Sequence, residues 1–104
     1  SWAASHPRGK ELLAAAHASC FAMALSGGLA RNSTPAERLD VSATITFEKV
    51  EAGWRVTKSA LTLKGVVPGL DAAKFSELAE AAKGGCPISS ALAGNVAISL
   101  EIVG

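Results

Sequence analysis

The sequence has only two cysteines, Cys20 and Cys86, and a formal net charge of +1 at pH 7 with the charged residues scattered along 104 residues. Scattered charge forms no basic patch of the kind that binds nucleic acid or an anionic membrane. The sequence also has no Gly-x-Ser-x-Gly elbow, no phosphate-binding loop and no dinucleotide fingerprint. If the chain is an enzyme, its cysteines are therefore expected to carry the chemistry.

Long hydrophobic runs are also missing. The longest apolar stretch closes at the glycine pair 27–28 and at Arg31, short of the roughly 18 residues needed to span a membrane. Pro7 and Arg8 stand where a secretory signal would need apolar residues, so we expect a cytoplasmic protein. In a reducing compartment, two cysteines are expected to be free, catalytic or redox-sensing rather than permanently bonded.

Hydrophobic residues make up 49% of the chain, and they concentrate in residues 11–26. This stretch has no proline, glycine or β-branched residue, which predicts a helix ending at Gly27-Gly28. Its apolar residues fall on every side, as in a helix buried in a core. His17 lies one turn before Cys20 on the same face, and a lone histidine there is more typical of a hydrogen-bonded core residue than of a ligand or base.

Two strands are predicted to follow. Apolar and polar residues alternate over residues 41–48, which indicates a half-buried strand. Residues 54–67 predict a second strand that pairs with it in an antiparallel hairpin, and a bulge would explain its less regular pattern.

The remainder predicts two helices and a last strand. Asp71 is the expected N-cap of a helix that ends near Lys83, before two glycines. Pro87 opens a short helix to about Leu92, and residues 95–103 alternate as a strand. The order α-β-β-α-α-β predicts a single domain over residues 1–104, of the α+β class, with helices packed on an antiparallel sheet.

The two cysteines each allow two interpretations. Cys20 is mid-helix, where cysteine often serves as a small hydrophobe and where burial makes it inert unless a cation stabilises the thiolate. Cys86 is at the N-cap of a short helix, where free N–H groups favour a thiolate and where Ser89 could add a hydroxyl; otherwise Gly-Gly-Cys-Pro only starts a helix. His6 and His17 do not complete zinc-ligand spacing with the cysteines, so we expect no metal.

Two motifs resemble the OsmC/Ohr family, whose branches are named for osmotic induction and for organic hydroperoxide resistance. Glu11-Leu-Leu-Ala-Ala-Ala-His-Ala-Ser-Cys-Phe-Ala-Met-Ala-Leu25 resembles the central-helix motif of the family. Gly85-Cys-Pro-Ile-Ser-Ser-Ala-Leu92 resembles its cysteine-proline-x-serine motif. The resemblance covers about residues 9–103, is closer to the OsmC branch, and lacks most of the N-terminal β-hairpin usual in the family.

The resemblance implies an OsmC-like fold, an intertwined homodimer and a peroxidase of the antioxidant stress response. Cys20 would be the peroxidatic cysteine that attacks organic hydroperoxides, and Cys86 the resolving cysteine that forms a disulfide with it. The reductant would be an external dithiol such as a lipoyl protein, with no bound cofactor. The alternative is a non-enzymatic homodimer of the same fold that has structural thiols and binds an apolar ligand at its interface.

The family activates its peroxidatic thiolate with an arginine, which is oriented by a glutamate ten residues before the cysteine. Here Lys10 stands ten residues before Cys20, and Glu11 is the candidate glutamate. On a regular helix Glu11 would point about half a turn away from Cys20. Arg8 is the candidate arginine.

Overall fold

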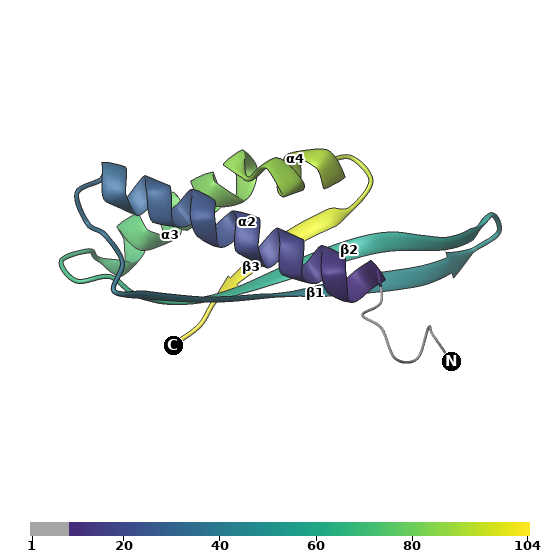
Figure 1. Cartoon of the computed structure of the whole chain (residues 1–104), viewed down its shortest axis with the longest axis horizontal. Coiled ribbons are helices and arrows are strands. Elements are labelled where there is room, and N and C mark those ends of the chain that lie inside the picture. The colour runs from purple at the N-terminus through teal and green to yellow at the C-terminus, as the bar shows by residue number, and fades with distance from the viewer. Residues whose placement is uncertain (1–8) are drawn as a thin grey trace.

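The computed structural model describes residues 9–104, in which three helices lie along one side of a three-stranded sheet (Figure 1). The elements in chain order are α2 (Gly9–Arg31), β1 (Arg38–Val50), β2 (Gly53–Val66), α3 (Ala72–Gly85), α4 (Pro87–Leu92) and β3 (Ala97–Ile102). The predicted order of elements and the α+β class are confirmed.

Helix α2 does not end at Gly27-Gly28, as its sequence predicts, but continues to Arg31. Each glycine costs a helix about 1 kcal/mol relative to alanine, but the extra turn buries Leu29 completely. The left-handed residue that closes the helix is Ser33, with φ 62°. The N–H of Thr34 then donates to the carbonyl of Leu29 at 2.9 Å, as in a Schellman motif.

One face of α2 is buried, and the rest of the helix is largely exposed within this chain. The buried residues recur every four positions and are His17, Phe21, Leu25 and Leu29. By length and composition α2 would be able to cross a membrane, contrary to the sequence-based expectation, because it continues past the glycines. Core helices meet the same criteria, but only 22% of the apolar window of α2 is buried within this chain, so the expected burial on every side is not found here.

The sheet has the order β1-β2-β3 and is mixed. β1 and β2 form the predicted antiparallel hairpin, and the register shift between Thr46 and Phe47 leaves Thr57 as the extra residue of the predicted bulge. β3 pairs with β2 in parallel, so the prediction of a wholly antiparallel sheet is wrong. The reason is the connection: α3 and α4 carry the chain back over one side of the sheet, and such a crossover returns it in the same direction (Figure 1).

Helices α3 and α4 meet at Cys86, which caps both of them. The Asp71 carboxylate accepts a hydrogen bond from the Lys74 N–H at 2.7 Å, which confirms the predicted N-cap of α3. Helix α4 has the predicted bounds, with Pro87 in its first turn. Cys86 is completely buried, so this junction places it in the hydrophobic core.

Two glycines in different surroundings test how closely the core is packed. A Cβ at Gly65 would lie 2.7 Å from the Phe75 ring and 3.1 Å from Leu39. We expect Gly65→Ala to lower the free energy of unfolding by about 1–3 kcal/mol, because the contact forces side chains to shift. Gly84 lies in α3 with nothing within 4 Å, so Gly84→Ala should raise it by about 0.5–1 kcal/mol. Urea unfolding of both variants measures the difference, and a shift of the same sign in both would contradict this packing.

Candidate functional site: a buried pair of thiols

The fold brings the two cysteines together. Cys20 comes from the middle of α2 and is half-buried, whereas Cys86 comes from the α3–α4 junction and is buried, and both are free thiols. Their side chains lie within hydrogen-bonding reach of each other. The site therefore contains two neighbouring thiols, contributed by the two motifs that are singled out in the sequence.

The surroundings of Cys86 favour its thiolate. Burial alone would raise the pKa of Cys86, but the N–H of Ser89, the Cys20 thiol, the Ser89 hydroxyl and the N–H of Ile88 together lower it. The sulfur makes no capping hydrogen bond of ordinary geometry. The N–H groups of the first turn of α4 nevertheless face it, and they have no partner within the helix. The pKa of Cys86 is therefore below that of an ordinary thiol.

Cys20 is affected in the opposite direction. The N–H of Ile88 lowers its pKa, but the hydrogen bond and the charge of Cys86, together with burial, outweigh that effect and raise it. Of the two thiols, Cys86 is therefore the more readily ionised. Within residues 9–104, no basic side chain acts to lower the pKa of Cys20.

Of the two predicted activating residues, only Glu11 lies in the described chain, and it is not beside Cys20. Arg8 lies outside the described residues. Glu11 is exposed and belongs to the same continuous helix as Cys20, nine residues earlier. At 100° and 1.5 Å per residue, this spacing puts Glu11 half a turn around the helix and about 14 Å along its axis from Cys20. Glu11 and Cys20 of one chain therefore do not meet.

His17 is completely buried and joins three elements by hydrogen bonds. Its Nδ1 lies 2.6 Å from Ser59 Oγ in β2, and its Nε2 lies 2.8 Å from Ser89 Oγ in α4. Burial lowers the pKa of His17, which favours the neutral ring. This confirms the expected core histidine. Ser59 is not among the residues singled out in the sequence, although a serine on the same strand face as Leu61 and Leu63 is itself a signal of a buried hydroxyl.

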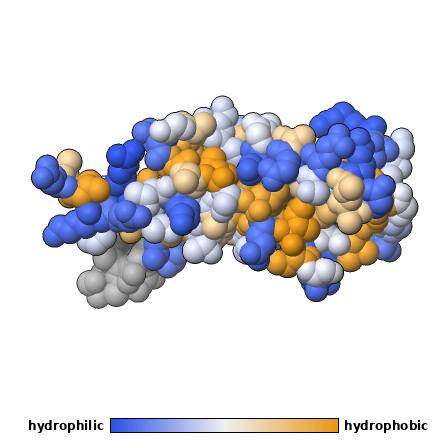
Figure 2. Space-filling view, turned by 180° about the vertical axis from the view of Figure 1, so that it is seen from behind, coloured by the Kyte–Doolittle hydropathy of each residue, from blue (hydrophilic) through white to orange (hydrophobic). Residues whose placement is uncertain are grey.

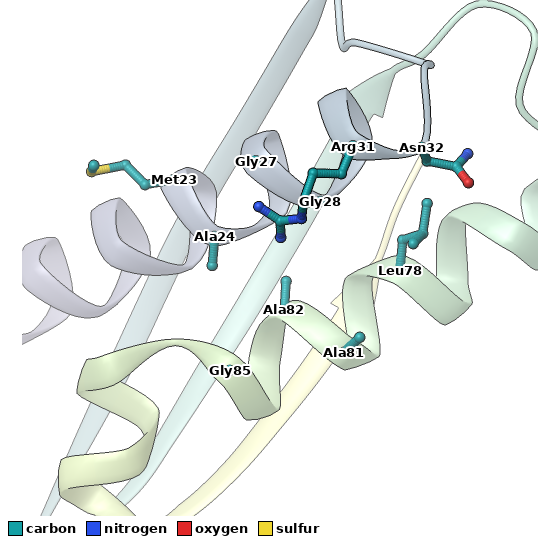
Figure 3. A pocket seen from close by; sticks show the side chains of 10 residues that line it. All are labelled: Met23, Ala24, Gly27, Gly28, Arg31, Asn32, Leu78, Ala81, Ala82 and Gly85. Atoms are coloured by element: carbon teal, nitrogen blue, oxygen red, sulfur yellow. The ribbon is translucent and has the colours of Figure 1, made fainter.

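A hollow of about 580 Å³ lies between α2 and α3 (Figure 3). The Arg31 side chain extends over its glycine-lined wall, and Leu78 and Ala82 face it from α3 (Figure 3). The lining residues are Met23, Ala24, Gly27, Gly28, Arg31, Asn32, Leu78, Ala81, Ala82 and Gly85. Neither cysteine is among them, but Gly85 directly precedes Cys86 and Ala24 lies one helical turn after Cys20, so the hollow lies next to the thiol site.

These features define a class of protein: an α+β fold in which a helix and a helix junction present a dithiol. Residues 9–104 contain no cluster of three or more histidine, cysteine or acidic side chains that would hold a metal ion.

The chain belongs to the OsmC family, since the model of "OsmC-like protein" matches residues 3–101. It is 39% identical over 93 residues to peroxiredoxin OsmC of Escherichia coli (strain K12), an alignment that covers 89% of this chain and 65% of that protein. It is 33% identical over 93 residues to the organic hydroperoxide resistance protein OhrA of Bacillus subtilis (strain 168), covering 89% and 64%. The chain thus spans just under two thirds of the length of these relatives.

Solved structures share the fold. The organic hydroperoxide resistance protein OhrB of Bacillus subtilis superposes with a TM-score of 0.81 at 28% identity, covering 99% of this chain and 76% of that one. An OsmC protein from Legionella pneumophila has a TM-score of 0.84 at 24% identity, covering 96% and 72%. The OsmC-like fold implied by the resemblance is confirmed.

Protonation of His17 should destabilise the fold. Because its pKa is lower in the folded chain than in the unfolded one, its contribution to stability is present above the unfolded value of roughly 6.5 and is lost as the pH falls through the folded value. We expect the free energy of unfolding to decrease with falling pH in this range, and His17→Gln to remove that part of the decrease. Urea unfolding at several pH values measures how steeply the free energy of unfolding depends on pH in the original chain and in His17→Gln. His6 is present in both proteins, so its contribution cancels in the comparison. Equal slopes would contradict a neutral, buried His17.

Proposed function

We propose that this protein is a thiol-dependent peroxidase that reduces organic hydroperoxides. The observation that carries the proposal is that the free thiols of Cys20 and Cys86 are neighbours in the fold. Two relatives, which are named as a peroxiredoxin and an organic hydroperoxide resistance protein, support the same class of reaction.

The proposed reaction has three steps. The Cys20 thiolate attacks the terminal oxygen of the hydroperoxide and forms an S–O bond as the O–O bond breaks, so that Cys20 becomes a sulfenic acid. The alkoxide leaves and takes a proton from solvent to become the alcohol. The Cys86 thiolate then attacks the Cys20 sulfur, forming a disulfide and releasing hydroxide, which takes a proton to become water. An external dithiol, such as a lipoyl protein, returns two electrons and two protons by thiol–disulfide exchange.

The described chain favours one step of this reaction and hinders another, as the pKa values of the two thiols indicate. A lowered pKa makes Cys86 ready for the second step, whereas the raised pKa of Cys20 hinders the first. Cys20 therefore needs a nearby cation. We propose Arg8 as that cation and Glu11 as the carboxylate that orients an arginine; because Glu11 does not reach Cys20 of its own chain, this role requires a second subunit.

A homodimer is the second part of the proposal. Leu12 and Met23 are 60% and 74% exposed, and their spacing of eleven residues puts them on one face of α2, opposite the buried face. Apolar residues also lie in patches across the middle of the molecule when it is seen from behind (Figure 2). Uncovered apolar surface of this kind is typical of a subunit interface. We propose a cytoplasmic protein that has no nucleic-acid or membrane partner.

The peroxidase is tested by counting free thiols. One equivalent of cumene hydroperoxide should consume both thiols in the original chain, and dihydrolipoamide should restore them. Cys20→Ser should abolish peroxide consumption, whereas Cys86→Ser should stop after one turnover with a sulfenic acid that dimedone traps. Ser26→Ala, an exposed change on the same helix, is the matched control and should behave like the original chain. Full consumption by Cys20→Ser would refute the assignment.

The dimer is tested by sedimentation velocity. We expect the mass of two chains, and the double variant Leu12→Lys, Met23→Lys should sediment as one chain because it puts two charges on the proposed interface. Ser76→Lys, an exposed change on α3, should leave the dimer intact. A monomeric original chain, or a dimer that survives both lysines, would argue against this interface.

The rival function is a non-enzymatic homodimer that binds an apolar ligand. The raised pKa of Cys20 favours this alternative, because a protonated thiol is a poor nucleophile. The thiol count separates the two functions, since thiols untouched by cumene hydroperoxide in the intact dimer would leave only the binding role.

A further inference from the structure

We propose that His17 is a positioning residue for Cys86: it donates a hydrogen bond from Nε2 to Ser89 Oγ and thereby directs the Ser89 hydroxyl proton toward the Cys86 sulfur. Its two ring nitrogens lie 2.6 Å from Ser59 Oγ and 2.8 Å from Ser89 Oγ. His17, Ser59, Ser89 and Cys86 are all buried, so the protein itself must satisfy these groups.

The positions of the protons follow from the hydrogen-bonding capacity of each group. A serine hydroxyl has one proton to donate and two lone pairs to accept with. If the Ser89 proton points to the Cys86 sulfur, Ser89 can only accept from His17, so the ring must carry its proton on Nε2. A neutral ring protonated on Nε2 accepts at Nδ1, and Ser59 supplies that hydrogen bond. The direction of donation therefore runs from Ser59 to His17, to Ser89 and to Cys86.

Position along the chain supports the same direction. Ser89 follows the capping Cys86 by three residues, so both lie in the first turn of α4. The Ser89 hydroxyl acts to lower the pKa of Cys86, as expected for a donor facing a thiolate. Without His17 the Ser89 proton would be free to turn away from the sulfur. His17, which bonds to β2 and α4 from α2, thus fixes the Ser89 hydroxyl of the cysteine-proline-x-serine motif.

The catalytic consequence rests on the proposed peroxidase, because only there does a Cys86 thiolate resolve an oxidised Cys20. The arrangement itself does not depend on that function and is tested in the reduced protein without peroxide. The titratable groups of the described chain that face Cys86 are Cys20 from α2 and, through Ser89, His17. Lys83, three residues before Cys86, is paired with Glu80 at 3.0 Å and is not among the groups that shift the pKa of Cys86.

The test measures the pKa of Cys86 from the ultraviolet absorbance of its thiolate, in a Cys20→Ser background that leaves one thiol and keeps a hydroxyl donor at residue 20. Ser89→Ala should raise the pKa of Cys86 by about one unit, which is about tenfold less thiolate at a given pH below the pKa. His17→Asn should do the same, because its shorter amide reaches the side of Ser59 but not Ser89. His17→Gln places an amide N–H near Ser89 and should retain the low pKa, and Ser90→Ala, an exposed change on α4, is the control.

A purely structural histidine would give a different result. The His17→Asn and His17→Gln variants would then have the same pKa for Cys86 and differ only in thermal stability, and this result would overturn the proposal. An unchanged pKa of Cys86 in Ser89→Ala would overturn it as well. If a variant fails to fold, the original protein still decides the question, because ¹⁵N NMR of the His17 imidazole shows which ring nitrogen carries the proton. A proton on Nε2 supports the proposal, and a proton on Nδ1 alone in the thiolate state contradicts it. If the protein fails to consume peroxide but its variants show these pKa shifts, the proposed peroxidase function is refuted and the proposed role of His17 in positioning Ser89 is supported.

Discussion

The burial of one face of α2 against the sheet and against helices α3 and α4 is the constraint on which the rest of the structure depends. Phe21, Leu25 and Leu29 supply the apolar part of this contact, and they are completely buried. His17 supplies the polar part through two serines on different elements. Because Cys20 lies on the same helix and Cys86 caps the helices packed beside it, the contact also sets the distance between the two sulfur atoms.

That packing creates an unequal pair from two identical side chains. Cys86 is at the start of a helix, where N–H groups lack carbonyl partners, and it gains hydrogen bonds that favour a thiolate. Cys20 is in the middle of a helix whose own N–H groups are already bonded, so the backbone of α2 offers its sulfur little. The asymmetry therefore follows from position within secondary structure. It explains why a mid-helix thiol that is to react with peroxide needs a cation from elsewhere.

Local sequence signals predicted most of the elements, because caps and alternation act over a few residues. Asp71, Pro87 and the alternating strands are of this kind, and the pairing of Cys20 with Cys86 was expected from the family resemblance. The end of α2 was missed because the burial of Leu29, a long-range contact, outweighs the local preference of two glycines to end a helix. The direction of β3 was missed because alternation is the same in parallel and antiparallel strands. Ser59 was missed because its partner, His17, is 42 residues away, and no local pattern records such a contact.

The separation of the two cysteines along the chain has a consequence for reduction. A disulfide between Cys20 and Cys86 would close a loop that contains β1, β2 and α3, and closing a loop of this length removes about 4 kcal/mol of conformational entropy, as TΔS, from the unfolded chain. The oxidised form would then resist unfolding more than the reduced form. By thermodynamic linkage the disulfide would also be harder to reduce in the folded chain than in the unfolded one, by roughly 90 mV. A monothiol leaves a mixed disulfide that a second thiol must resolve, whereas a dithiol resolves it by closing its own ring. In the proposed peroxidase, regeneration of the cysteine pair would therefore favour a dithiol with a low reduction potential.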